Sequence, residues 1–119
     1  MEFHRILDQT TDPDSLQRRL TVPDLPAACD LIDNLVEDRG ADQGVIYCLW
    51  GEFRVNRELI HGGVRFSLPD CPNGVAWTLT TGHPPDESAI VLHLTMHRRE
   101  HEPDFIESLE AFADAWQLP

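Results

Sequence analysis

The chain has 119 residues, enough for one domain over residues 1–119 that buries a core without metal or disulfide staples. Its hydrophobic fraction of 41% excludes a disordered tail. The formal net charge is −12, and every basic residue is an arginine. Long-range electrostatics therefore oppose direct binding to nucleic acids or to anionic membranes, and favour basic partners.

The first ten residues carry no secretory signal, and the longest fully apolar run, residues 45–50, is too short to span a bilayer. The three cysteines, Cys29, Cys48 and Cys71, are an odd number at wide spacings, without a C-x-x-C pair. This pattern is typical of reduced thiols rather than of a disulfide framework or a zinc knuckle. We therefore expect a cytoplasmic protein without a cofactor.

The first third of the chain contains two helix signals. Residues 11–14 combine a capping side chain with Pro13 at the first helical position, which predicts a short helix over residues 13–20. Apolar residues then recur at helical spacing over residues 25–36, and Gly40 lies where a helix C′ glycine would. The opposite side of this second predicted helix is acidic and includes Asp30, Asp33 and Glu37.

The middle of the chain changes to a period of two after Gly44. The pattern predicts five strands, over residues 45–50, 53–60, 64–68, 75–80 and 89–97. Short turns between consecutive strands favour an antiparallel meander. For the first strand, which is apolar on both sides, we expect Val45, Tyr47 and Leu49 to face the core and Ile46 and Cys48 to face outward.

The C-terminal residues predict a helix that starts at residues 102–104. Its apolar stripe consists of Phe105, Leu109, Phe112 and Trp116, and its acidic residues Glu107, Glu110 and Asp114 point elsewhere. A helix with one apolar stripe needs a sheet face on which to bury it. We therefore predict a two-layer α+β fold, a five-stranded antiparallel meander with N-terminal and C-terminal helices packed on one face (α-β-β-β-β-β-α).

Three histidines, His93, His97 and His101, follow one another at intervals of four residues. On a helix they would share one face, as zinc ligands do, but residues 89–97 alternate with the period of a strand. Residues four apart on a strand are separated by about 13 Å, too far for one zinc ion. At the following turn, His97, His101 and Glu100 could still meet, although capping and solvated charge explain them better. The sequence therefore predicts no metal site.

The outward face of the sheet is predicted to be a partner-binding surface, because arginine and tryptophan often dominate protein interfaces. Alternatively, a dimer partner or residues 2–8 cover this face, and the apolar edge strand over residues 45–50 pairs in a homodimer or is covered by the N-terminal residues. The residues expected on the face are Trp50, Arg54, Asn56, Arg65, Thr78, His93 and His97.

The two ends of the chain are acidic. Residues 1–42 hold ten acids and four arginines, whereas residues 100–119 hold six acids and no base. The carboxylates on the predicted helices either are solvated or present negative charge to a basic protein. The residues concerned are Asp30, Asp33, Glu37, Glu107, Glu110 and Asp114.

No catalytic signature, such as G-x-S-x-G, H-E-x-x-H or a P-loop, is present in the sequence. The sequence therefore names no catalytic residue and favours a role without catalysis. Our first hypothesis is a small acidic protein that binds a basic protein, as an inhibitor, an immunity-type protein or an assembly adaptor. The alternative is a protein that binds a small anion or a metal ion, through the exposed sheet face or the acidic helix.

Overall fold

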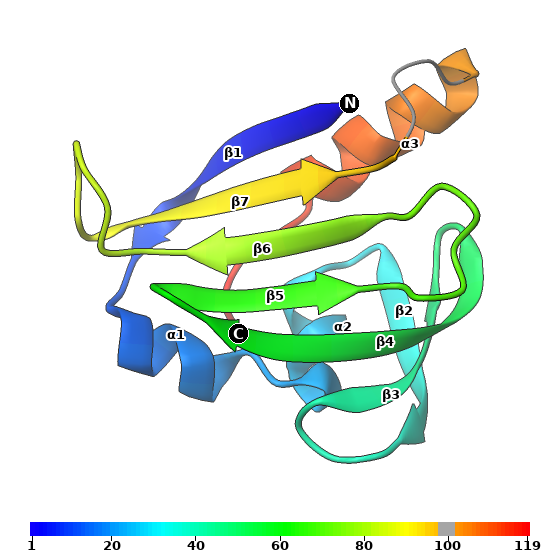
Figure 1. Cartoon of the computed structure of the whole chain (residues 1–119), viewed down its shortest axis with the longest axis horizontal. Coiled ribbons are helices and arrows are strands. Elements are labelled where there is room, and N and C mark those ends of the chain that lie inside the picture. Colours follow the sequence, from blue (N-terminus) through cyan, green and yellow to red (C-terminus); the bar gives the residue numbers. More distant parts are fainter. Residues whose placement is uncertain (98–101) are drawn as a thin grey trace.

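The computed structural model describes residues 1–97 and 102–119 and forms a seven-stranded antiparallel sheet with three α-helices (Figure 1). The strand order across the sheet is β1-β7-β6-β5-β4-β3-β2. The strands are β1 (Glu2–Thr10), β2 (Ile32–Asp38), β3 (Gln43–Cys48), β4 (Gly51–Ile60), β5 (Gly63–Ser67), β6 (Ala76–Thr80) and β7 (Ala89–Thr95). The helices are α1 (Pro13–Arg19), α2 (Leu25–Ala28) and α3 (Pro103–Asp114), with a 3-10 turn at Val22–Asp24.

The structure confirms the α+β class and the antiparallel sheet, but the prediction of five strands was wrong. The five predicted strands are β3 to β7, and β1 and β2 extend this meander at its two ends. β1 pairs with β7, so β7 is an internal strand rather than an edge. Residues 2–8 therefore add a strand at the edge of the sheet instead of covering its outward face.

The prediction of a helix over residues 25–36 was also wrong. Helix α2 ends at Ala28, and the chain turns and returns as β2, which pairs with β3. A period of 3.6 over a short apolar segment is weak evidence for a helix, and Ile32, Asn34 and Val36 are poor helix formers. The backbone groups of β3 instead offer hydrogen-bond partners along β2, although the pairing is irregular at two places. Residues 45–50 are thus no longer an edge, which removes the apolar strand that favoured a homodimer.

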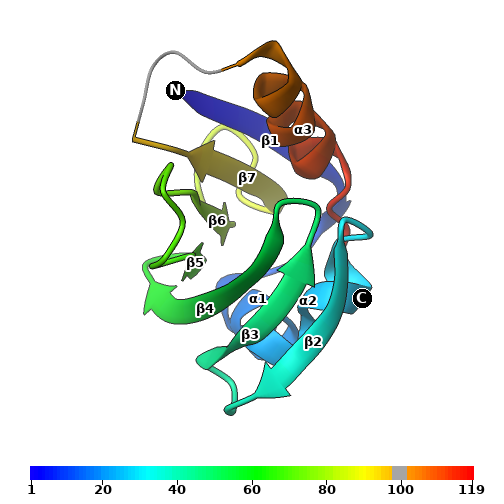
Figure 2. The same cartoon turned by 90° about the vertical axis from the view of Figure 1, so that its right-hand side faces the viewer.

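The helices lie on one side of the sheet, which curves around α1 and α2 (Figure 2). Helix α1 packs on β5 and β6, α2 packs on β2, and α3 packs on β1. The two outer helices that the sequence predicts, over residues 13–20 and from residue 103, are present as α1 and α3. Asp12 caps α1, since its carboxylate accepts hydrogen bonds from the backbone N–H and the hydroxyl of Ser15.

An aromatic cluster forms the centre of the core between the sheet and α3. Trp77 on β6 is 1% exposed, and its ring centroid lies 5.1 Å from that of Phe112 on α3. Phe66 on β5 and Trp116 after α3 complete the cluster, at 5.6 Å and 5.8 Å from Trp77. Such stacked, tilted and edge-on pairs stabilise beyond the area that they bury. The stripe predicted for the last helix is therefore the face that α3 presents to the sheet.

Strand β3 presents the opposite face from the one we expected. Ile46 is fully buried and Cys48 is 3% exposed, whereas Tyr47 is 50% exposed. The hairpin turn uses Leu49 and Trp50, because Cys48 pairs with Gly51. A strand that is apolar on both sides gives no alternation from which to choose a face, and the pairing with β4 makes the choice.

Two alanine substitutions on β3 test which face is buried. We expect Ile46→Ala to lower the free energy of unfolding by about 2–5 kcal/mol, since it leaves a cavity in the core. The matched change Tyr47→Ala removes a half-exposed ring, and we expect a loss of less than about 1 kcal/mol. Urea denaturation of both variants measures the difference, and a larger loss for Tyr47→Ala would reverse the assigned faces.

All three cysteines are free thiols, as the sequence predicts. Cys29 is fully buried, and desolvation raises the pKa of its thiol to about 12. Burial also raises the pKa of the Cys48 thiol. Cys71 is only partly buried.

The thiols should differ in reactivity, because the thiolate is the form that attacks a disulfide reagent. We expect the folded protein to react with an aromatic disulfide reagent at one site, Cys71, and to expose the other two thiols only in denaturant. Thiol titration with and without guanidinium chloride measures this ratio, and Cys71→Ser is the control that should abolish the native reaction.

Candidate functional site

The outward face of the sheet is the first candidate surface. In residues 1–97 and 102–119, no helix packs on it. Cross-strand pairing places five polar side chains in one row across five strands, because directly paired residues point to the same face. In order from β4 to β1 they are Glu58, Arg65, Thr78, His93 and His4.

The two arginines predicted on this face are there, but each is neutralised by a carboxylate. Arg54 donates two hydrogen bonds to Asp70, at 2.7 Å and 3.0 Å, and Arg65 donates to Glu58 at 3.0 Å. The Arg54 guanidinium in turn lowers the pKa of the Asp70 carboxyl. As far as residues 1–97 and 102–119 show, the face therefore lacks the uncompensated positive centre that a small-anion site would need.

The placement of Trp50 on the outward face was wrong. Trp50 lies in the β3–β4 turn, and its side chain packs against α3. Its ring centroid lies 4.8 Å from that of Phe112, and its Nε1 donates to Ser108 Oγ at 2.9 Å. Trp50 thus anchors α3 to the sheet instead of offering a contact to a partner.

The histidines of the last strand separate as strand geometry requires. His93 lies on β7 and shares the outward face with His4 on β1, with ring centroids 4.2 Å apart. His97 lies after β7 beside Gly74 and lines a hollow of about 160 Å³ together with Arg65 and Cys71. The predicted turn cluster of His97 with Glu100 and His101 lies outside the described residues.

A group of three possible metal ligands forms around His93. Glu2 Oε2 lies 2.6 Å from His93 Nε2, and the ligand atoms of Glu2, His4 and His93 all lie within 4.8 Å of one another. The hydrogen bond from His93 is the main reason why the pKa of the Glu2 carboxyl is lowered. The sequence alone does not indicate this group, because Glu2 and His4 lie at the other end of the chain and only the β1–β7 pairing brings them to His93.

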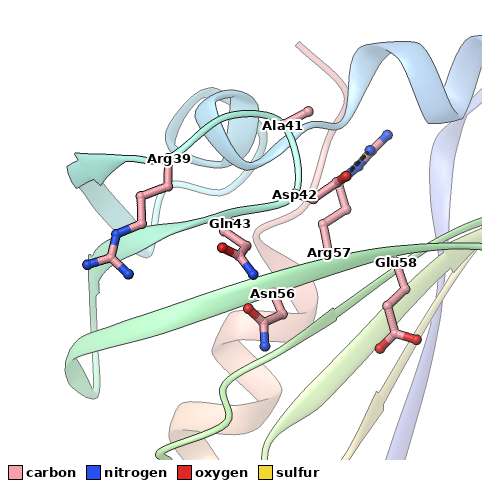
Figure 3. A pocket seen from close by; sticks show the side chains of 7 residues that line it. All are labelled: Arg39, Ala41, Asp42, Gln43, Asn56, Arg57 and Glu58. Atoms are coloured by element: carbon pink, nitrogen blue, oxygen red, sulfur yellow. Dashed lines mark hydrogen bonds and ion pairs between the residues drawn. The ribbon is translucent and has the colours of Figure 1, made fainter.

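A hollow of about 610 Å³ lies beside the β2–β3 loop (Figure 3). Arg57 on β4 points to this loop, but its side chain is only 6% exposed. Its guanidinium donates to the backbone oxygens of Gln17 and Leu20 and to Asp42. Arg57 therefore ties α1 and the loop to the sheet. The predicted site residue Asn56 lines the same hollow, but the guanidinium of Arg57 is already hydrogen-bonded within the chain.

The acidic residues form a second candidate surface. It lies on helix α3 and on strand β2 with the turn before it, and not on two helices as predicted. Glu107, Glu110 and Asp114 are exposed on α3, as predicted. Asp30 lies in the turn before β2, and Asp33 and Glu37 lie on β2 itself, so they do not share a helical face. A β-bridge between Cys29 and Trp116 joins the start of this segment to the end of α3.

Arginine pairing leaves this acidic surface largely uncompensated. Five of the seven described arginines are ion-paired: Arg5 with Asp114, Arg39 with Glu37, Arg54 with Asp70, Arg57 with Asp42 and Arg65 with Glu58. The remaining two, Arg18 and Arg19, donate to Ser15 and to the carbonyl oxygen of Pro119. Within the described part, Asp30, Glu107 and Glu110 have no ion-pair partner.

Comparison with models of protein families gives no match, and comparison with curated protein sequences gives none either. Among the described residues, no helix has the length and apolar character needed to cross a membrane.

The structural role of Trp50 can be tested with its hydrogen-bond partner. We expect Trp50→Phe and Ser108→Ala each to lower the free energy of unfolding by about 0.5–1.5 kcal/mol, because each removes the Nε1–Oγ hydrogen bond. The double variant should lose less than the sum of the two, since the bond is lost only once. Chemical denaturation of the four proteins gives the coupling energy, and strict additivity would show that the bond contributes nothing.

Proposed function

We propose that this chain is a non-enzymatic binding protein that holds a basic protein partner against the acidic surface formed by α3 and the start of β2. The observation that carries the proposal is the distribution of charge. Every described arginine forms an ion pair or a hydrogen bond within the chain. By contrast, Glu107, Glu110 and Asp30 face solvent without an ion-pair partner among the described residues.

The spacing on α3 supports this proposal. Glu107, Glu110 and Asp114 follow one another at intervals of three and four residues, so they lie along one side of the helix. At about 1.5 Å per residue the row is roughly 10 Å long. A row of this length suits two arginine or lysine side chains on a helix or an extended segment of the partner, and a third would compete with Arg5 for Asp114.

The rigidity of the surface supports it too. Three ring contacts, from Trp50, Trp77 and Trp116, hold Phe112 and thereby α3 on the core. The backbone that carries these charges is already ordered before binding, so association loses less conformational entropy. Electrostatic attraction would mainly raise the association rate and exclude acidic competitors.

The three reduced thiols suit a cytoplasmic setting. An acidic surface that binds a basic protein suits an inhibitor, an immunity-type protein or an assembly adaptor. Of the alternatives, small-anion binding on the outward face has lost support, because Arg54 and Arg65 are paired with carboxylates. The metal-ion alternative has a specific observation in its favour at one place, the group of Glu2, His4 and His93.

The acidic-surface proposal is tested with a neutralised variant and a matched control. We expect Glu107→Gln/Glu110→Gln to weaken binding to the partner isolated from the native host, and Asp14→Asn/Glu87→Gln, with the same net charge, to leave it nearly unchanged. Association rates measured by surface plasmon resonance should also fall at least about tenfold between about 50 mM and about 500 mM salt.

Two outcomes would contradict the proposal. One is an association rate that does not respond to salt. The other is an equal loss of affinity in both double variants, which would show that the overall net charge matters and the α3 surface does not.

A further inference from the structure

We propose that Glu2, His4 and His93 form a binding site for a divalent transition-metal ion, with Zn²⁺ as the ion that fits best. The site lies on the outward face of β1 and β7. It is independent of the acidic surface on α3 and β2, so either proposal can fail without the other.

The sheet builds this site from the two ends of the chain. β1 pairs antiparallel with β7, and His4 lies directly opposite His93. Side chains on a strand alternate between faces, so Glu2 points to the same face as His4, two residues away. Glu2 and His93 are 91 residues apart in sequence and yet in contact.

Cross-strand placement solves the distance problem that excludes a site along one strand. Residues four apart on β7 are separated by about 13 Å, whereas neighbouring strands lie only about 4.8 Å apart. The imidazole rings of His4 and His93 stack with centroids 4.2 Å apart and planes 7° from parallel. Together with Glu2, they place three ligand atoms within 4.8 Å of one another.

Side-chain rotation would bring the ligand atoms, now within 4.8 Å of one another, to the separation that zinc requires, with the stacked rings of His4 and His93 turning so that a nitrogen of each points to the ion. With bonds of about 2.0–2.1 Å in a tetrahedral site, two ligand atoms lie about 3.3 Å apart. The Glu2 oxygen and the His93 nitrogen, at 2.6 Å, are hydrogen-bonded to each other and would move slightly apart around an ion. Glu2 and His4 are exposed and His93 is partly exposed, so their side chains can turn without disturbing the core.

The ligand set selects the kind of metal. Two imidazoles and one carboxylate suit Zn²⁺ and its neighbours Co²⁺, Ni²⁺ and Cu²⁺, whereas Mg²⁺ and Ca²⁺ prefer oxygen ligands alone. Three protein ligands leave a fourth position for water, which is the arrangement of an open site.

The surrounding charges favour a cation at this place. The chain has a net charge of −12, and the arginine of the same cross-strand row, Arg65, is neutralised by Glu58. The arginine next to His4 in sequence, Arg5, is paired with Asp114 of α3. In the described part of the chain, both nearby arginines are thus ion-paired, and neither would repel a cation bound at Glu2 as an unpaired arginine would.

Zinc titration with matched variants tests the proposal. We expect the protein to bind one equivalent of Zn²⁺ by isothermal titration calorimetry, and Glu2→Gln, His4→Gln and His93→Gln each to weaken binding by at least about tenfold. The control is His61→Gln/His83→Gln, which removes another pair of neighbouring histidines, with ring centroids 5.8 Å apart, and should bind as the wild type does.

A second readout separates coordination from a general effect on folding. Zn²⁺ bridges β1 and β7, so it should raise the melting temperature of the wild type and the control, but not that of the three ligand variants. Circular dichroism of the metal-free variants checks that they fold, and Glu2→Gln changes a side chain that is 60% exposed. No zinc binding by the wild type, or loss of binding in the control alone, would overturn the proposal.

Discussion

The pairing of β1 with β7 is the interaction on which the rest of the structure depends. It makes β7 an internal strand and brings the N-terminal residues to the C-terminal third of the chain. From β1, Arg5 forms an ion pair with Asp114 of α3, and the Gln9 amide exchanges two hydrogen bonds with the backbone of Leu118. One added strand thus holds the last helix and the C-terminal tail on the sheet, and also assembles Glu2, His4 and His93.

The opposite edge of the sheet depends on a different constraint. β2 covers β3 and becomes the outer strand, but it carries Asp33 and Glu37, and its pairing with β3 is irregular at two places. Charges and bulges on an edge strand oppose pairing with another chain. The same residues that protect this edge add to the acidic surface that continues through the Cys29–Trp116 bridge to α3.

Arginine is used inside this chain as a structural residue. Arg57 is buried under α1, and Arg5, Arg54 and Arg65 are paired with acids on neighbouring elements, whereas Arg39 is paired with Glu37 two residues before it. The sequence shows 21 acids against nine bases, but it does not show which acids remain unpaired. The proposed function depends on which acids stay unpaired. The unpaired acids on α3 leave negative charge exposed there, whereas the acids on the sheet face neutralise Arg54 and Arg65.

The sequence by itself determined the five strands β3 to β7, the helices α1 and α3 and the reduced thiols, because periodicity, capping and turn residues act over a few positions. Only the tertiary structure decided that residues 2–10 and 32–38 are strands, which face of β3 is buried and that Trp50 packs on α3. These features depend on hydrogen bonds and packing contacts with segments that are distant in the sequence, which local patterns do not reveal. The candidate sites divide in the same way: the acidic residues of α3 are evident from local spacing, whereas Glu2, His4 and His93 meet only when the two ends of the chain pair.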